Sequence, residues 1–140
     1  MCNSAIRLLR EVDQMSDVKY EMHVVEMGPL VSEFIAAKIL VFFKIGAPPE
    51  LAEFSILHEP SDFFTDVEPG DSIVFDEQSY GVTAVGDVAN QNIRALGHLI
   101  MKANGRTEPE LPGDVCVEDK ELPPIEVGTT IRIIARESGD

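Results

Sequence analysis

The sequence predicts a mainly β fold: a small closed or nearly closed β-barrel, or a sandwich, of short strands with about two short helices. Short apolar segments rich in β-branched and aromatic residues recur along the chain, separated by glycines, prolines and acidic residues. The strand-to-helix alternation of a doubly wound α/β sheet is missing from this pattern. With 140 residues, of which 44% are apolar, the chain is long enough for one domain with a hydrophobic core.

Strand-like segments begin at residue 18. They cover 18–28, 39–45, 55–58, 67–76, 80–86, 98–103, 114–118 and 129–136, and the fourth of them begins with a turn. The first segment alternates, with apolar side chains on one face at Val18, Tyr20, Met22 and Val24. His23 falls on the opposite, polar face, so we expect it to be a surface residue.

Two segments have the spacing of short helices. Residues 29–38 have a proline near their start and apolar residues at helical intervals. Residues 87–97 offer Asp87 as a candidate N-cap and Gly97 as a C-terminal stop. Residues 46–54, GAPPELAEF, are expected to form a turn because their two consecutive prolines exclude a central strand.

The chain is strongly acidic, with a net charge of −14 at pH 7 and a pI of about 4.4. Such a protein should repel nucleic acid and anionic membranes, and a protein partner should be basic where it touches the chain. The longest apolar stretch, residues 30–43, is interrupted by Glu33 and Lys38 and is too short to span a membrane. We therefore expect neither nucleic-acid binding nor direct membrane insertion.

Residues 1–16 are set apart from the rest because their two arginines and two acids cancel, so the whole charge of −14 lies in 17–140. We interpret them as an N-terminal extension, either an over-long start with the natural one at Met15 or a loosely attached segment. An ordinary helix docked on the domain is the alternative. Residues 17–140 then form a single domain. Cys2 and Cys116 are far apart and outside any CxxC pair, which is typical of a reducing compartment.

One window of the chain is distinctive. Between Lys44 and Arg94 there is no lysine or arginine, but there are ten acids and His58. A negative field favours imidazolium, so it should raise the pKa of His58 if the ring is exposed. An anion held there would need backbone N–H groups or the few nearby cations. The window is either a docking surface for a basic partner or a solvated acidic face.

The three histidines, His23, His58 and His98, lack metal-ligand spacing, and no phosphate-binding loop or hydrolase motif is present. His58 ends the apolar run FSILH, so it is either a core histidine or one presented for chemistry. His98 follows Gly97 and would share a face with Arg94, four residues earlier, if the helix continued. The alternative for His98 is a buried histidine at a strand start, satisfied by backbone hydrogen bonds.

Four segments of the chain are distinctive when taken together: FKIGAPPELAEFSILHE (43–59), YGVTAVGDVANQNIRALGH (80–98), EPELPGDVCV (108–117) and VGTTIRI (127–133). The most specific part is VTAVGDVANQNIRALGH. In order and spacing, over about residues 17–136, the segments resemble one family, the glucitol/sorbitol-specific IIA component of the bacterial phosphoenolpyruvate-dependent sugar phosphotransferase system (PTS).

The resemblance implies a small β-barrel that acts as a cytoplasmic phosphocarrier and needs no cofactor or metal. A histidine accepts a phosphoryl group from the carrier protein HPr and passes it to the IIB component, which phosphorylates a polyol entering through the membrane component IIC. That histidine corresponds to His58. His98 matches the LGH of the family, which implies a supporting role. Relatives often have a second histidine two positions on, where this chain has Pro60.

Histidine suits such a relay, because neutral imidazole is a good nucleophile and its phosphoramidate stays reactive. The resemblance implies attack by Nε2 of His58, and we expect Nδ1–H to be held by a backbone carbonyl or an acid. The candidate acids are Glu59, Asp62 and Glu53. Candidate contacts for phosphoryl oxygens are Arg94, His98, the amides near residues 55–57 and those around Gly86.

Two other functions remain compatible with the sequence. One is a non-catalytic, IIA-like barrel that regulates or binds without relaying phosphate. The other is a small metal-dependent enzyme built from the three histidines. Phosphorylation of His58 separates the carrier from the first alternative, and zinc or iron in the purified protein would mark the second.

Overall fold

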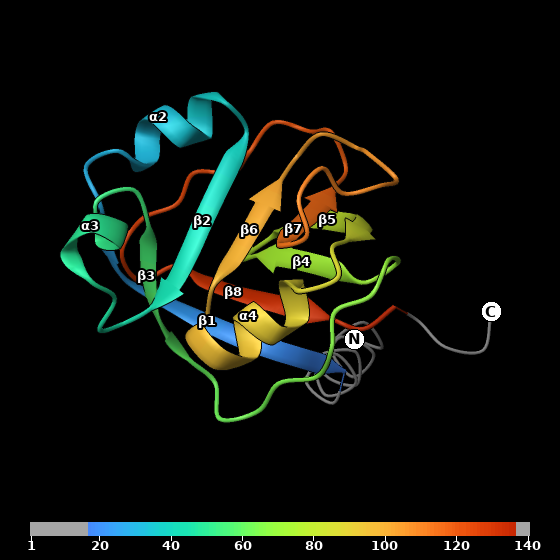
Figure 1. Cartoon of the computed structure of the whole chain (residues 1–140), viewed down its shortest axis with the longest axis horizontal. Coiled ribbons are helices and arrows are strands. Elements are labelled where there is room, and N and C mark those ends of the chain that lie inside the picture. Colours follow the sequence, from blue (N-terminus) through green and yellow to red (C-terminus); the bar gives the residue numbers. More distant parts are fainter. Residues whose placement is uncertain (1–16, 137–140) are drawn as a thin grey trace, which may run out of the picture.

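The computed structural model describes residues 17–136, which form a closed β-barrel (Figure 1). Around the barrel the strands follow the order β1-β3-β2-β6-β7-β5-β4-β8. This confirms the predicted mainly β barrel, while residues 1–16, interpreted as an extension, lie outside the described residues. The strands are β1 (Val18–Met27), β2 (Ile39–Lys44), β3 (Ile56–Pro60), β4 (Ser72–Phe75), β5 (Gln78–Val85), β6 (Leu99–Lys102), β7 (Asp114–Val117) and β8 (Thr130–Ile134).

Both parallel and antiparallel pairs close the barrel. β2 pairs with β3 and β6 with β7 in parallel, and the other neighbours are antiparallel. Parallel partners need a crossover connection, and the one between β2 and β3 contains the helix α3 (Pro49–Ala52). β1 pairs with both β3 and β8, and its two register shifts, between Val18 and Tyr20 and between Val24 and Glu26, let this long strand bend.

The barrel interior holds the main hydrophobic core. In β1 the inward residues Tyr20, Met22 and Val24 are buried, whereas His23 is exposed. This confirms the predicted alternation from Tyr20 to Val24 and the prediction that His23 is a surface residue. Val18, which was expected on the same inward face, is only half-buried and lies before a register shift of the strand.

A second, smaller apolar cluster lies outside the barrel wall. Val41 and Phe43 of β2 pack with Leu57 of β3, and Phe34 of α2 (Val31–Ala36) and Leu51 of α3 cover them. Figure 1 shows both helices on this side of the molecule. Because β2 is buried on both faces, its sequence is a continuous apolar run instead of an alternating one.

The segment 46–54, expected to be a turn, contains α3. Pro49 occupies the start of this helix, where its missing N–H has no intrahelical partner to lose and its φ already suits a helix. The prolines that exclude a strand therefore begin a helix, and the described residues contain three short helices where about two were expected.

The helix α4 (Ala89–Leu96) ends as predicted, at Gly97 in the left-handed conformation with φ +61°. Its start differs from the prediction, because the N-cap is Val88 instead of Asp87 and no side chain caps it. The N–H of Val88 donates to the carbonyl of Pro112 at 2.9 Å. Backbone carbonyls thus provide partners at the helix start, where a side-chain carboxylate was expected.

Candidate functional site

β3 places His58 inside the barrel wall. Successive side chains of a strand alternate, so Ile56 and His58 share the inward face while Leu57 points into the outer cluster. The exposed fraction of His58 is 0%, and the ring of Phe42 packs edge-on with its centroid 6.3 Å away. The histidine that the sequence singled out is therefore covered on all sides in this conformation.

The ring of His58 is held through one nitrogen. Nε2 lies 2.7 Å from the hydroxyl oxygen of Tyr20, which comes from the inward face of β1 and is 3% exposed. Nδ1 has no hydrogen-bond partner within residues 17–136. The expected hydrogen bond from Nδ1 to a carbonyl or an acid is thus not formed, and Tyr20 on the other nitrogen orients the ring instead.

Burial lowers the pKa of His58 to about 4, because taking the ring out of water disfavours its charged form. Weak contacts with the carbonyl groups of Ile56 and Phe43 act in the opposite direction. The acidic window was expected to raise this pKa only for an exposed ring, and desolvation dominates here because the ring is buried. His58 is therefore neutral at physiological pH and carries a nucleophilic lone pair.

A pocket of about 300 Å³ lies next to the imidazole. Tyr20 and Gly97 both line it, and a Cβ built on Gly97 would stand 3.1 Å from Nε2 of His58. The same Cβ would approach the backbone nitrogen of Lys44 to 2.9 Å. Nε2 is thus separated from the pocket by the hydroxyl of Tyr20 and by Gly97, whose missing side chain allows the close approach of Lys44 and the imidazole.

Two cations stand at this pocket, at the two ends of the lysine- and arginine-free window. Lys44 of β2 is in register with His58 of the parallel strand β3, and Arg94 comes from α4. Arg94 donates to a carboxylate oxygen of Asp66 at 2.9 Å, and its guanidinium lies 5.1 Å from the ring centroid of Phe64. Because the pocket also meets the C-terminal, negative end of α4, an anion there would need these cations.

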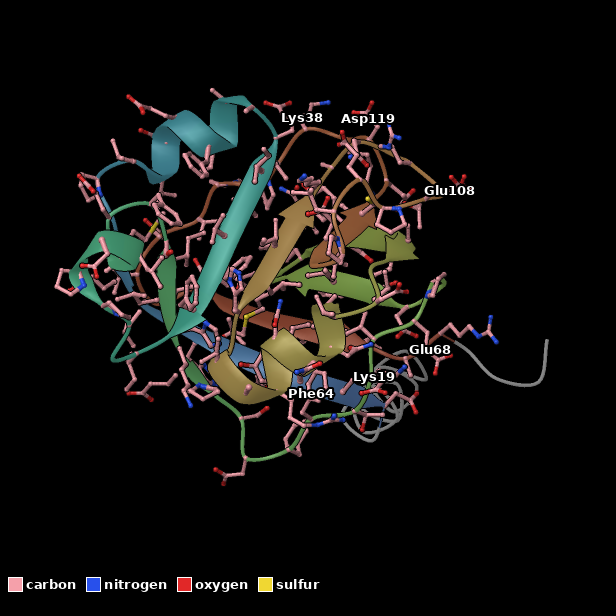
Figure 2. All side chains as sticks on the ribbon, viewed as in Figure 1. Lys19, Lys38, Phe64, Glu68, Glu108 and Asp119 are labelled. Carbon is pink, nitrogen blue, oxygen red and sulfur yellow. The ribbon has the colours of Figure 1, made fainter. Side chains whose placement is uncertain are left out.

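The connection from β3 to β4 forms one wall of the pocket. Figure 2 shows Phe64 of this connection beside α4. Backbone hydrogen bonds hold the connection on both sides of Phe64. The N–H of Ser61 donates to the carbonyl of Glu21, and the N–H of Thr65 donates to the carbonyl of Lys19. Further along, Lys19 donates to Asp71 at 2.7 Å in a buried ion pair. The short stretch between Ser61 and Thr65 therefore carries the aromatic part of the wall.

The candidate acids do not meet the ring. Glu59 follows His58 on the strand, so its exposed side chain points to the opposite face. Asp62 is exposed at the pocket mouth. Glu53 lies at a separate groove of about 920 Å³ between β1 and α3, which is not lined by Tyr20 or Arg94.

His98 lies on the other side of β2 from His58. Its ring stacks on Phe43 of the outer cluster, with centroids 4.1 Å apart and planes at 10°. Its Nδ1 is 3.3 Å from the carbonyl oxygen of Phe42, and burial lowers its pKa while that carbonyl opposes the shift. Since α4 ends at Leu96, His98 does not continue the helical face of Arg94. The contacts of His98 match the backbone-satisfied histidine that the sequence left as an alternative.

Two of the other candidate contacts, the amides of Gly86 and Ser55, are already engaged in backbone hydrogen bonds. The amide of Gly86 donates to the carbonyl of Asp114 at 2.8 Å, and that of Ser55 to the carbonyl of Ala52 at 3.2 Å. His23 is exposed and lies 2.8 Å from a carboxylate oxygen of Glu21. Within residues 17–136, no three histidine, cysteine or acidic side chains are grouped to hold a metal ion.

Sequence reasoning missed Tyr20 and Lys44 as site residues. A buried tyrosine usually needs a partner for its hydroxyl, so the inward position of Tyr20 carried a usable signal. Lys44 was noted only as the edge of the acidic window. Its place beside His58 depends on the parallel pairing of β2 and β3, which local sequence does not reveal.

The fold and the site together define a small closed β-barrel protein with one neutral, buried histidine beside a pocket that carries two cations. The same fold occurs in a crystal structure of a PTS system IIA component from Enterococcus faecalis V583, with a TM-score of 0.71 and 22% identity over 82% of this chain and 99% of that one. Within residues 17–136, no helix is long and apolar enough to cross a membrane.

The sequence decides the family. Residues 19–132 match the PTS system glucitol/sorbitol-specific IIA component family. The PTS glucitol/sorbitol-specific EIIA components of Shigella flexneri and of Escherichia coli (strain K12) are each 33% identical to this chain over 100 residues, 71% of this chain and 81% of theirs. The chain belongs to the glucitol/sorbitol-specific IIA family, and it is a IIA component of the sugar-transporting PTS, as the resemblance implied.

Proposed function

We propose that this protein is a phosphocarrier that accepts a phosphoryl group on Nε2 of His58 and passes it on during uptake of glucitol, sorbitol or a related polyol. The observation that carries the proposal is the orientation of a neutral imidazole. Nε2 lies next to Tyr20 and Gly97, which line a pocket with two cations, Lys44 and Arg94. The pKa of His58, lowered by burial to about 4, keeps the lone pair of Nε2 free of a proton.

The bonds, electron pairs and protons of the transfer balance without a general base. The lone pair of Nε2 forms a bond to phosphorus while the phosphorus–nitrogen bond of the donor histidine breaks, and its electron pair returns to the donor ring. A donor ring protonated on its other nitrogen leaves neutral, and His58 becomes the phosphorylated imidazolium. In-line approach and stabilisation of the equatorial oxygens are then the main requirements, and Lys44 and Arg94 supply the positive charge.

Access to His58 requires a local opening, because the ring is fully buried. The stretch between Ser61 and Thr65 lines the pocket and carries Phe63, which is half exposed. A shift of this stretch, together with the ring of Phe64, would admit a phosphoryl group without disturbing the barrel.

The donor and acceptor proteins that we propose are HPr and the IIB component. Phe63 lines the pocket, and Ile45 and Leu96 follow or precede its lining residues Lys44 and Gly97 in the chain; all three side chains are exposed and give such partners an apolar contact. Glu59, Asp62 and Asp66 surround them with negative charge, which fits a basic partner surface and speeds its association. A relay of this kind works in the cytoplasm, where we place the protein.

The test is phosphate incorporation from phosphoenolpyruvate through enzyme I and HPr, followed by intact mass. We expect one acid-labile phosphate on the wild type and on His98→Gln, and none on His58→Gln. Circular dichroism and thermal melts establish that each variant is folded. A folded wild type that takes no phosphate from a competent HPr would overturn the proposal.

One observation favours a second candidate, a IIA-like barrel that binds or regulates without relaying phosphate. The ring of His58 is completely buried, whereas a relay needs the nitrogen to be reached. The same experiment decides between the two, because the second candidate predicts an unlabelled wild type.

A further inference from the structure

We propose that Tyr20 is a further catalytic residue of this site: its hydroxyl donates to Nε2 of His58 at rest and to a phosphoryl oxygen during transfer. The second part rests on the proposed function, and the first part does not. The basis is the hydrogen bond of 2.7 Å between these two buried side chains, of which Tyr20 lines the pocket.

Counting protons identifies the donor. A tyrosine hydroxyl has one proton to donate, and Nε2 of His58 is its hydrogen-bond partner within residues 17–136. With the imidazole proton on Nδ1, the hydroxyl donates to the lone pair of Nε2, so its proton has an acceptor. With the proton on Nε2, the hydroxyl would have to accept instead, and its own proton would lack an acceptor among the described residues.

The resting hydrogen bond therefore selects the reactive tautomer. Attack by Nε2 requires its lone pair to be free of a covalent proton, and donation from Tyr20 stabilises that arrangement. Burial raises the pKa of Tyr20 above its usual value, so the group remains a hydroxyl and acts as a donor, not as a base.

The position of the hydroxyl is fixed by packing. The ring of Tyr20 meets His58 edge-on at 5.8 Å between centroids and Phe64 edge-on at 5.6 Å. Tyr20 lies on β1, which pairs on both sides within the closed barrel. The donor is thus held in place before the phosphoryl group arrives, which is how a hydrogen bond contributes most to catalysis.

The same hydroxyl can serve the phosphoryl group. When phosphorus bonds to Nε2 it takes the direction of the lone pair, and its oxygens come within reach of a donor that stood beside that nitrogen. A hydrogen bond to an anionic oxygen is about twice as strong as one to a neutral acceptor. The interaction is then stronger in the transition state than at rest, which accelerates transfer. No proton leaves Tyr20, so the balance of the step is unchanged.

The first experiment tests the resting state without any partner. The protein is labelled with ¹⁵N-histidine, His58→Gln identifies the resonances of His58, and the ring nitrogens are compared in the wild type and in Tyr20→Phe. We expect a protonated Nδ1 and an unprotonated Nε2 in the wild type, and exchange between tautomers in Tyr20→Phe. A proton on Nε2 in the wild type would overturn the tautomer assignment.

The second experiment measures transfer, with phospho-HPr and separately with the small donor phosphoramidate. We expect Tyr20→Phe to accept phosphate about tenfold more slowly from either donor. The matched control is Tyr80→Phe, since Tyr80 is also buried and donates its hydroxyl to the carbonyl of Glu121 at 2.5 Å, far along the chain from the site. It should lose stability but transfer at the wild-type rate. A folded Tyr20→Phe that transfers as fast as the wild type, or faster, would overturn the catalytic role, because Tyr20 would then only shield Nε2 from solvent.

If Tyr20→Phe does not fold, a third experiment tests the role of the hydroxyl without removing it. The chain has two tyrosines, so 3-fluorotyrosine in the Tyr80→Phe protein labels Tyr20 alone. We expect its ¹⁹F resonance to move on phosphorylation, because the hydroxyl changes its acceptor. An unmoved resonance would contradict the proposal. A wild type that neither donor phosphorylates would instead refute the proposed function, and the ¹⁵N measurement would still decide the tautomer.

Discussion

His58 and His98 flank the strand β2 from its two sides. Inside the barrel, His58 packs edge-on against Phe42 and shares a hydrogen bond with Tyr20. Outside it, His98 stacks on Phe43 and has its Nδ1 3.3 Å from a backbone carbonyl. Burial lowers the pKa of both rings. The two environments differ mainly in what each ring faces.

This comparison shows that burial and a lowered pKa do not by themselves identify a reactive histidine. His98 is fixed by a carbonyl and a stacked ring, and these contacts offer no cation to an incoming anion. Nε2 of His58 lies next to Tyr20 and Gly97, which line a pocket together with Lys44 and Arg94. The neighbours that would stabilise a product therefore distinguish the two histidines better than their protonation states do.

The largest expected effect concerns the stability that His58 contributes. Its pKa is about 4 in the folded protein and about 6.5 when unfolded, so the unfolded chain binds more protons between these values. The contribution of the neutral His58 to the free energy of unfolding is then fully present above pH 6.5. It is lost as the pH drops toward 4, and the loss amounts to roughly 3 kcal/mol. Urea unfolding at several pH values gives the free energy of unfolding of the wild type and of His58→Gln. The difference between these two free energies, followed with pH, measures the contribution of His58.

Carboxylates titrate in the same range, and the subtraction of His58→Gln removes their shared contribution. His98→Gln should show a difference of the same sign but smaller size, because that ring is only half buried. Equal pH dependence for His58→Gln and the wild type would mean that His58 is not neutral by burial, and the contrast between the two histidines would fail.

The next largest expected effect is on the rate of phosphoryl transfer, and it comes from Gly97 next to Nε2 of His58. In Gly97→Ala the new Cβ would lie 3.1 Å from Nε2 and 2.9 Å from the backbone nitrogen of Lys44, at a φ of +61°. We expect phosphoryl transfer to fall roughly a hundredfold, because small displacements of reacting groups are costly. Gly128→Ala is the matched control, since Gly128 has φ +99° and no atom within 4 Å of the new Cβ.

Gly128→Ala should cost about 1 kcal/mol from its backbone conformation and leave transfer unchanged. Melting curves give the stabilities and phosphorylation kinetics give the rates. If the two alanine variants transferred equally well, the approach to Nε2 would not pass Gly97.

The fold was largely predictable because its signals are local. The alternation in β1, the β-branched content of β2 and Gly97 at the end of α4 each follow from adjacent residues. The same local reasoning failed at residues 46–54, where Pro49 starts a helix, and at Asp87, whose expected capping role is not taken up because backbone carbonyls provide partners at the helix start.

The site was only partly predictable because it is assembled across strands. His58 and Arg94 followed from the family motif. Tyr20 comes from β1 and Lys44 from β2, and only the pairing of both strands with β3 brings them to the imidazole. The burial of His58 stayed open in the sequence, since the apolar run before it allowed a core histidine and the acids after it allowed one presented for chemistry.

The cations of the pocket give a smaller effect. We expect Arg94→Ala and Lys44→Ala each to slow phosphoryl transfer about tenfold, with Arg94→Lys in between, because each cation stabilises developing charge on the oxygens. Stability should hardly change, since the ion pair of Arg94 with Asp66 is exposed.

Lys120→Ala is the control, as Lys120 pairs with Glu118 away from this pocket. A loss of rate of the same size in Lys120→Ala would indicate an effect of overall charge on the partner instead of contact with phosphate.

The smallest effect tests the structural role of His98. His98→Phe keeps the stack on Phe43 but loses the contact with the carbonyl of Phe42, while His98→Ala loses both. Thermal melts should show a loss of about 1 kcal/mol for the alanine variant and less for phenylalanine. Both should accept phosphate at close to the wild-type rate, because the ring stands on the outer side of β2. If His98→Ala slowed transfer while His98→Phe did not, His98 would act by packing β2 against His58. If both slowed it equally, its nitrogen would take part in the site, which is the supporting role that the family motif implies.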